Sequence, residues 1–411
     1  MGNNKKIAII SSYREACGIA AYAERLEKEF QKYGHVEVLA LNTEVLKSNN
    51  EELIALGDML ISEIAEKLKE YDYVNIQFEA GLFGWAPERI FKRVQVLLKE
   101  CKNVIFTFHS VNFDTPRLFR RQLLSIHFIK VLIKYLEKKR WPKLYDQLVR
   151  ELRKMDNDSG CKANIIVHDS KTQRFISRVY HFEHTYAHPL GLSNIDERSI
   201  PRTAEEIEGF RQKYKIMPEE KCIGVFGFIS EYKGHLTALK ALRCLPNNYR
   251  LLIFGSQHPA SVQPFVSVDP YLKVLLEYIE DCDQVDIKAK CQKFSERVTF
   301  AGDVNDQAFA QAMRCCDVVV LPYIEVNQMG SGIAAQAIEN HARTILSNTK
   351  CFQEFGTYYP NCFSTFDIGN YMELADRIVN FEDKYDDAIE CALKEHNIEK
   401  NVQEYMRIFE R

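Results

Sequence analysis

The chain alternates between short apolar runs and longer segments with helical periodicity. The apolar runs are rich in β-branched side chains, which is typical of strands buried on both faces of a parallel sheet. In the first half they are Ile7–Ile10, Val36–Leu41, Tyr73–Gln77, Val104–Phe108 and Asn164–Val167. In the second half they are Cys222–Phe226, Tyr249–Phe254, Val298–Phe300, Val318–Leu321 and Arg343–Ser347. Amphipathic segments such as Ala20–Tyr33 and Trp85–Glu100 follow, so the pattern predicts an α/β fold with two doubly wound layers.

The repeated pattern predicts two domains, and so does the length of 411 residues, which exceeds one ordinary core. We expect an N-terminal Rossmann-like domain over residues 1–195 and a C-terminal one over residues 204–395. Polar residues from Asn194 to Thr203 lose the apolar periodicity and mark the boundary. A last helical stretch, Asn397–Phe409, closes the chain, and we expect residues 396–411 to pack back on the first domain.

Composition narrows the class of protein. The chain is 46% hydrophobic and 27% charged with a formal net charge of -3, so it reads as globular and gives no reason to expect nucleic acid as a partner. It has no apolar run of about 20 residues and no signal peptide at its start, so we expect a cytoplasmic protein. Its 12 cysteines include no Cys-x-x-Cys pair, which favours reduced thiols over a zinc site or a disulfide framework.

One segment, about residues 113–155, departs from the regular α/β spacing and predicts a helical insertion in the first domain. Twelve basic and four acidic side chains lie between Phe113 and Lys154, among apolar residues such as Ile133 and Trp141. This mixture suits a helix on an anionic membrane surface at the inner face of a membrane, or one that meets an anionic acceptor. The alternative is a helical hairpin that packs on the core and leaves its basic face in solvent.

Candidate chemistry gathers where strands end and helices begin. In open α/β sheets ligands bind beyond the carboxyl ends of the strands, and helix N-termini there suit phosphate. After the first strand the turn contains Arg14, Gly18 and Ile19, without the Gly-x-Gly-x-x-Gly pattern of dinucleotide binding. Glu79 and His109 follow the next two central strands and can contact substrate hydroxyls. A loop-stabilising Glu79 and a structural His109 are the alternatives.

The second half offers two further loops. Gly227, Phe228 and Lys233 lie between a strand and a helix, where a lysine can neutralise a departing pyrophosphate. Gly330-Ser331-Gly332 precedes the helix Ile333–Asn340 and predicts a concavity of phosphate size. Two Asp-x-Asp sequences, at Asp156 and Asp281, are expected to be solvated surface, so no metal requirement is predicted.

Taken in order, these loops resemble the retaining glycosyltransferases of family 4, which have the GT-B fold. The similarity spans nearly the whole chain and depends on the order and spacing of short segments. These are the glycine turn at Gly18, "QFEAGLFG" at Gln77–Gly84, "TFHS" at Thr107–Ser110, "HPLG" at His188–Gly191, "GFISEYKG" at Gly227–Gly234, "FAGDV" at Phe300–Val304, "DVVVLPY" at Asp317–Tyr323 and "QMGSGIAAQA" at Gln328–Ala337.

The resemblance implies two Rossmann-like domains that face a central cleft, with the nucleotide held mainly by the second. It implies a hexose transfer from a UDP- or GDP-linked sugar to a glycan or lipid-linked acceptor, with retention of configuration and without a metal or other cofactor. Gly18 and Lys233 would meet the donor diphosphate, and His109 and Glu79 would face the sugar and the acceptor. Backbone near Asp303 and Val304 would contact the base.

The chain departs from the family pattern at the donor site. Phe228 stands where the family has an arginine, so Arg14 or another residue would have to replace that cation. Gln328 and Gln336 stand where the family has a pair of glutamates, and Glu325 lies close enough in sequence to supply a carboxylate. These changes keep two other hypotheses open: a catalytically silent glycosyltransferase-like subunit that binds a partner or acceptor, and another nucleotide-sugar enzyme such as an epimerase.

Overall fold

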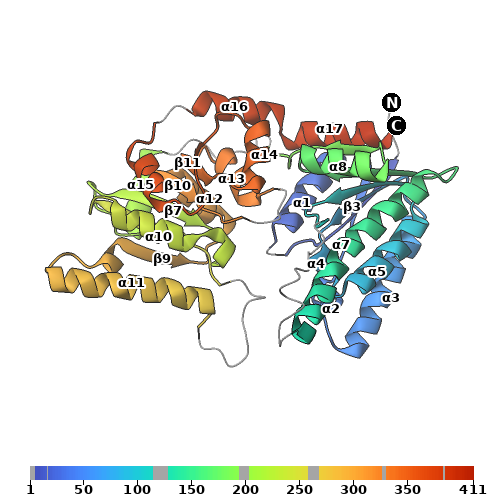
Figure 1. The fold of residues 1–411 in the computed structure, drawn as a ribbon. Coiled ribbons are helices and arrows are strands. Elements are labelled where there is room, and N and C mark those ends of the chain that lie inside the picture. Colours follow the sequence, from blue (N-terminus) through green and yellow to red (C-terminus); the bar gives the residue numbers. More distant parts are fainter. Residues whose placement is uncertain are drawn as a thin grey trace. The chain divides into compact units, whose positions relative to one another are not determined.

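The computed structural model describes residues 5–15, 17–113, 128–193, 203–257, 268–325, 330–382 and 385–411 (Figure 1). The chain divides into two compact units. The first contains the residues up to Gly191, the short segment at Gly330 and Ile398–Arg411. The second contains the rest of the chain between Leu192 and Asn397. Most of the linker predicted between Asn194 and Thr203 lies outside the described residues.

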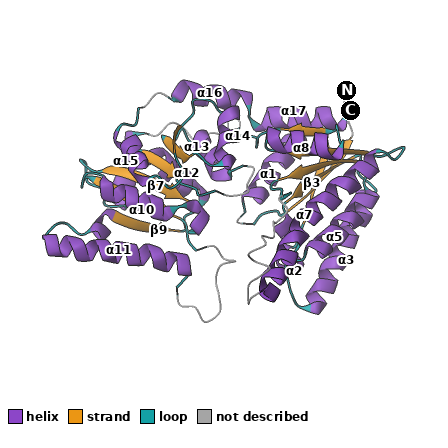
Figure 2. Cartoon of the chain, in the orientation of Figure 1, coloured by secondary structure: helices purple, strands orange, loops and turns teal. Residues whose placement is uncertain are grey.

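The first unit is built on a parallel sheet of six strands in the order β2-β1-β3-β4-β5-β6 (Figure 2). The strands are β1 Lys5–Ser11, β2 Gly34–Ala40, β3 Tyr73–Phe78, β4 Asn103–Phe108, β5 Lys162–Val167 and β6 Thr185–Ala187. The helices are α1 Gly18–Phe30, α2 Thr43–Leu46, α3 Glu51–Leu68, α4 Ala80–Phe83, α5 Pro87–Glu100, α7 Phe128–Asp156, α8 Ser170–Tyr180 and α17 Ile398–Phe409.

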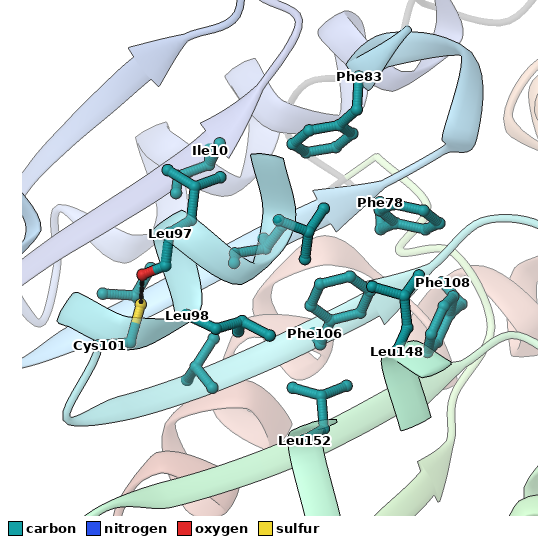
Figure 3. Close-up of a cluster of buried hydrophobic side chains, with 14 of the residues drawn as sticks. Ile10, Phe78, Phe83, Leu97, Leu98, Cys101, Phe106, Phe108, Leu148 and Leu152 are labelled. Atoms are coloured by element: carbon teal, nitrogen blue, oxygen red, sulfur yellow. Dashed lines mark hydrogen bonds between the residues drawn. The ribbon is translucent and has the colours of Figure 1, made fainter. Parts of the chain in front are cut away.

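Alternation along the strands divides the apolar side chains of this unit between two faces of the sheet. Ala8 and Ile10 belong to the core shared with α3, α5 and α7, whereas Ile7 and Ile9 face α1 and α17. The first core is dominated by phenylalanines of β3 and β4 that lie against leucines of α7 (Figure 3). With helices on both faces, every central strand is covered, which is why these strands are predominantly apolar.

The second unit repeats this architecture with the strand order β12-β11-β10-β7-β8-β9, again parallel. Its strands are β7 Lys221–Phe226, β8 Tyr249–Phe254, β9 Val298–Gly302, β10 Val318–Leu321, β11 Thr344–Ser347 and β12 Ser364–Phe366. Its helices are α9 Ala204–Lys213, α10 His235–Cys244, α11 Pro270–Ala289, α12 Asp306–Cys315, α13 Gly332–Glu339, α14 Lys350–Tyr358, α15 Tyr371–Val379 and α16 Asp386–Glu395, with 3-10 turns η2 Glu231–Lys233 and η4 Phe294–Arg297.

Two parallel sheets with helices on both faces confirm the predicted α/β class. All ten predicted strands are present, with ends that shift by one or two residues. The short edge strands β6 and β12 were not predicted, because three residues at a sheet edge carry too little apolar periodicity to stand out.

The helical insertion is represented by α7, which starts at Phe128; residues 114–127 of the predicted insertion lie outside the described residues. The C-terminal half of α7 packs on the core through Leu148 and Leu152, both fully buried. The side chains of Lys138 and Lys139 are exposed. No helix in the described ranges is long and apolar enough to cross a membrane.

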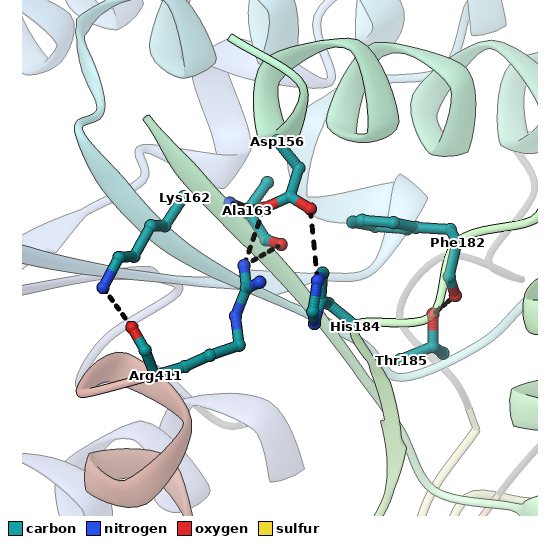
Figure 4. A network of polar contacts seen from close by, with 7 residues as sticks. All are labelled: Asp156, Lys162, Ala163, Phe182, His184, Thr185 and Arg411. Atoms are coloured by element: carbon teal, nitrogen blue, oxygen red, sulfur yellow. Dashed lines mark hydrogen bonds and ion pairs between the residues drawn. The ribbon is translucent and has the colours of Figure 1, made fainter. Parts of the chain in front are cut away.

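The expectation that the Asp-x-Asp at Asp156 is solvated surface holds for the exposed Asp158 and is wrong for Asp156. The Asp156 carboxylate accepts hydrogen bonds from the backbone N–H of Ala163 at 3.1 Å and from Arg411 at 2.6 Å, and it lies 3.6 Å from His184 (Figure 4). Asp156 therefore ties the end of α7 to β5 and to the C-terminus of the chain. Periodicity could not reveal this, because Arg411 lies 255 residues away in sequence.

Candidate functional site

The connection between β7 and α10 in the second unit is a tight turn that two glycines make possible. Gly227 has a φ of 104° and Gly234 a φ of 71°, both in the left-handed region that favours glycine. A Cβ at Gly234 would lie 1.8 Å from the carbonyl oxygen of Pro322, and one at Gly227 would lie 2.4 Å from Ile333. The turn thereby brings the 3-10 turn η2 back over the ends of β7 and β10.

Lys233, at the end of η2, is the most unusual residue of this turn, because its side chain is buried with only 5% of its surface exposed. Its ammonium donates a hydrogen bond to the Tyr323 hydroxyl and lies 4.1 Å from the centre of that ring. A Cβ at Gly227 would lie 3.4 Å from the Lys233 nitrogen. Burial lowers the pKa of Lys233 to about 7, so the site holds a cation at a considerable cost in solvation.

The start of α13 completes this cluster. The Ser331 hydroxyl accepts a hydrogen bond from the backbone N–H of Ala334 at 3.2 Å and so caps the helix, and it lies 3.4 Å from the Tyr323 hydroxyl. Lys233, Tyr323 and Ser331 thus form a continuous polar chain at a helix N-terminus. A buried ammonium beside the positive end of a helix dipole is suited to an anion.

The structure brings together Gly227, Lys233 and Ser331 from the predicted donor-binding residues. Phe228 is half-buried directly after Gly227, Gly330 and Gly332 flank Ser331, and Gln336 is half-buried one turn into α13. Glu325 is exposed after β10, and Gln328 lies outside the described residues. Asp303 is exposed and Val304 half-buried after β9, which lies two strands from β7 along the sheet.

A cavity of about 680 Å³ lies beside the same turn, on the side of α11 and α15. Glu231, Lys240, Asp269 and Tyr271 are among its lining residues. Gly234, which follows Lys233, lines it, whereas none of the described residues predicted to bind the donor does.

In the first unit the predicted residues meet at the carboxyl edge of the sheet. Phe78 pairs with Phe108 in the register of β3 and β4, which places Glu79 beside His109. The Glu79 carboxylate accepts a hydrogen bond of 2.6 Å from the Ser110 hydroxyl. Burial raises the pKa of Glu79, whereas the Ser110 hydroxyl and the N–H groups at the start of α4 lower it. Glu79 is thus held by these contacts beside His109 at the carboxyl edge of the sheet.

His109 is half-buried, and its imidazole is neutral. Its Nε2 lies 2.7 Å from Oε1 of Gln77, and its ring centre lies 5.1 Å from that of His168, which follows β5. Burial lowers the pKa of His109 well below the ordinary histidine value, and the neighbouring His168 lowers it further. At neutral pH the ring is therefore uncharged and acts through hydrogen bonds.

The turn after β1 is the third predicted part of this edge. Gly18 is exposed at the first position of α1, and no other group lies within 4 Å of where its Cβ would be. Ile19 packs against the core. Arg14 has a φ of 53° and its exposed guanidinium lies 5.0 Å from the ring centre of Tyr13.

Sequence reasoning did not single out several residues that contact the predicted ones. Tyr323 and Ser110 lie within segments that resemble the family, but no role was predicted for them. Gln77 was predicted only as the end of an apolar strand. His168 follows β5 in the same way as His109 follows β4. That repeated placement of a histidine at a strand end was a signal that could have identified it.

No family model matches the chain, and no curated protein matches its sequence. The described ranges contain no group of three or more His, Cys, Asp or Glu side chains placed to hold a metal ion.

Solved structures of glycosyltransferases are similar to the chain over its whole length. HepE from Anabaena, determined in complex with UDP, has a TM-score of 0.64 at 14% identity and covers 98% of this chain and 99% of its own. A glycosyltransferase from Rickettsia africae has a TM-score of 0.65 at 14% identity, covering 99% and 98%. Sucrose-phosphate synthase from Thermosynechococcus elongatus has a TM-score of 0.65 at 15% identity, covering 99% and 98%.

These similarities show that the chain has the fold of GT-B glycosyltransferases, with two parallel sheets of six strands flanked by helices. The predicted fold class is confirmed. At identities of about 15% the likeness concerns the fold, and the chemistry must be argued from the residues themselves.

Proposed function

We propose that the protein is a glycosyltransferase that uses a nucleotide sugar and binds the donor diphosphate at Lys233. The observation that carries this proposal is the buried ammonium of Lys233 beside Tyr323 and the N-terminus of α13. Among the described residues no carboxylate forms an ion pair with it, and a buried charge without a counter-ion is expensive. A diphosphate would supply the missing negative charge.

The similar structures support a nucleotide sugar as the source of that diphosphate. HepE was determined with UDP, with UDP and glucose, and with UDP-glucose. For this chain we propose a UDP- or GDP-linked hexose, transferred with retention of configuration and without a metal to a glycan or lipid-linked acceptor. The acceptor hydroxyl would approach on the side from which the diphosphate leaves, and Lys233 would stabilise the growing charge on that diphosphate.

Titration calorimetry with UDP- and GDP-sugars, followed by product analysis, tests this proposal. We expect one donor to bind and to be slowly hydrolysed or transferred, with the anomeric configuration of the product equal to that of the donor and with activity retained after chelation. Binding without turnover toward any acceptor would favour the silent subunit, which Phe228 and Gln336 at the donor site make the second candidate. No binding of any nucleotide sugar would refute the proposal.

We further propose that α7 brings the protein to an anionic membrane surface at its cytoplasmic side, where a lipid-linked acceptor would be met. The side chains of Ile133 and Leu136 are 51% and 54% exposed, and exposed Lys138 and Lys139 follow directly. Arg140 forms an ion pair with Glu88, so its charge contributes less to the proposed attraction to anionic lipid. Apolar side chains beside lysines suit insertion at a charged lipid interface.

Co-sedimentation with vesicles that contain anionic lipid at low salt tests this second proposal. Replacing Lys138 and Lys139 with glutamine should reduce binding. The matched control replaces the exposed Arg153 and Lys154 in the last turn of the same helix, which should leave binding nearly unchanged. Equal loss in both variants would show a non-specific charge effect, and no binding by the wild-type protein would refute the proposal.

A further inference from the structure

Two amides, Asn75 and Gln77, lie in the central strand β3, where the pattern of the other strands predicts apolar residues. Both side chains are 0% exposed. Burying an amide without partners is unfavourable, so each of its polar groups must be accounted for by a hydrogen bond. Residues two apart in a strand point to the same face of the sheet, which places these two amides in contact.

A backbone carbonyl determines which atom of each amide donates and which accepts. Nδ2 of Asn75 lies 3.2 Å from the carbonyl oxygen of Ile105 and 3.2 Å from the Thr107 hydroxyl. A backbone carbonyl can only accept, so the amide nitrogen of Asn75 must face it. Oδ1 of Asn75 then accepts from Nε2 of Gln77. With its nitrogen directed there, Gln77 presents Oε1 to His109 at 2.7 Å.

This chain of bonds determines which ring nitrogen of His109 carries the proton. Oε1 of Gln77 is an acceptor only, so Nε2 of His109 must donate. A neutral imidazole carries a single N–H, which leaves Nδ1 without a proton and able to accept a hydrogen bond. The burial that lowers the pKa of His109 keeps the ring neutral, so the assignment applies at physiological pH.

We propose that Asn75 and Gln77 are positioning residues that hold His109 as the Nε2–H tautomer and so present Nδ1 as a hydrogen-bond acceptor at the carboxyl edge of the first sheet. The group that would donate to Nδ1 is a hydroxyl, such as one of a sugar. That last assignment rests on the proposed function, whereas the tautomer itself does not.

The neighbouring His168 provides an internal reference for the opposite tautomer. Its Nδ1 lies 2.9 Å from the carbonyl oxygen of His188, which can only accept, so Nδ1 carries the proton. Burial lowers the pKa of His168 to about 4, so it is neutral over the same range. Two neutral histidines at adjacent strand ends thus have different protonated nitrogens for different reasons.

Nitrogen NMR of a perdeuterated protein that carries protonated, nitrogen-labelled histidine measures these tautomers directly. Nε2 couples to both ring carbon-bound protons and Nδ1 to one, which distinguishes the two nitrogens without any substrate. The chain has 11 histidines, and His109→Asn and His168→Asn identify the two signals by their loss. We expect protonated Nε2 for His109 and protonated Nδ1 for His168 at pH 7. A wild-type His109 with protonated Nδ1 would overturn the proposal.

Substitution tests whether the amides cause the preference. Gln77→Leu and Asn75→Leu should each change His109 from a single tautomer to a mixture. The matched control is Asn164→Leu, because Asn164 is also 0% exposed, lies in β5 on the far side of β4 from β3, and makes no side-chain hydrogen bond within the described part of the chain. That control should leave the His109 signals as in wild type, and the His168 signals should stay unchanged in all three proteins.

The outcomes separate this inference from the proposed function. If Gln77→Leu keeps its fold, shown by unchanged His168 signals, and His109 remains a single Nε2–H tautomer, the relay does not position the ring. If the tautomer becomes mixed and transfer by the protein is unaffected, the relay exists but Nδ1 plays no part in the reaction. A protein without any transferase activity still answers the question about the tautomer.

Discussion

Replacing Lys233 with methionine should weaken donor binding and, at the same time, stabilise the free protein. Methionine is an unbranched side chain one atom shorter than lysine, and it removes the charge. In the wild-type protein burial lowers the Lys233 pKa from 10.5 to about 7. Each pKa unit corresponds to about 1.4 kcal/mol, so holding the ammonium here costs on the order of 4 kcal/mol at pH 7.

The stabilisation that the variant gains by losing the buried charge is partly offset. The contacts of the ammonium with the Tyr323 hydroxyl and ring, worth roughly 1–2 kcal/mol, are lost. A net stabilisation of about 2 kcal/mol corresponds to an increase in Tm of roughly 4–8 °C for a domain of about 200 residues. The donor should bind about 10–100-fold more weakly, because a charge-assisted contact with phosphate is removed, and turnover should fall by about two orders of magnitude.

The pH dependence of the free energy of unfolding distinguishes the loss of the ammonium from other effects of the substitution. Between about pH 7 and 10.5 the unfolded lysine binds a proton that the folded one releases. Wild-type stability at this site therefore rises with pH in that window, and the advantage of the variant should shrink by about 2 kcal/mol between pH 7 and pH 9.

Differential scanning calorimetry at the two pH values, with calorimetric titration of the donor, provides the assay. Lys221→Met is the matched control, since Lys221 also contacts a tyrosine through its hydroxyl and ring but is exposed at the start of β7. It should change neither donor binding nor the pH dependence. A Lys233→Met protein that unfolds at a lower temperature at both pH values and binds donor normally would refute the reasoning.

Three further predictions concern the same candidate donor site. Donor affinity of the wild-type protein should fall by up to tenfold per pH unit above about pH 7, because binding must protonate Lys233; an affinity constant over this range would contradict this. Gly227→Ala should lower Tm and abolish donor binding, because its Cβ would lie 2.4 Å from Ile333 at a φ of 104°, whereas Gly209→Ala, with nothing within 4 Å on α9, should be neutral or slightly stabilising. Ser331→Ala should lower the free energy of unfolding by about 1 kcal/mol through loss of the α13 cap, measured by denaturant titration, and an unchanged midpoint would show that the cap is replaced.

Local pattern was sufficient for the α/β class, the ten longer strands and the loops at their ends. A strand covered on both faces is mostly apolar, so it is visible in the sequence without knowledge of its neighbours. Parallel strands also place their carboxyl ends at one edge of a sheet, so the sequence predicts that Glu79 and His109 lie at the same edge. In the same way, Lys233 and Ser331 were identified as residues of strand-to-helix turns.

The tertiary structure alone decided how these residues behave chemically. The burial of Lys233, and with it the lowered pKa, depends on Tyr323 and α13, which follow it by about ninety residues. The hydrogen bonds of Asn75 and Gln77 depend on β4, and the contacts of Asp156 depend on the C-terminus. Solvation and hydrogen-bond direction are set by groups distant in sequence, and hydrophobic periodicity records only which face of an element is buried.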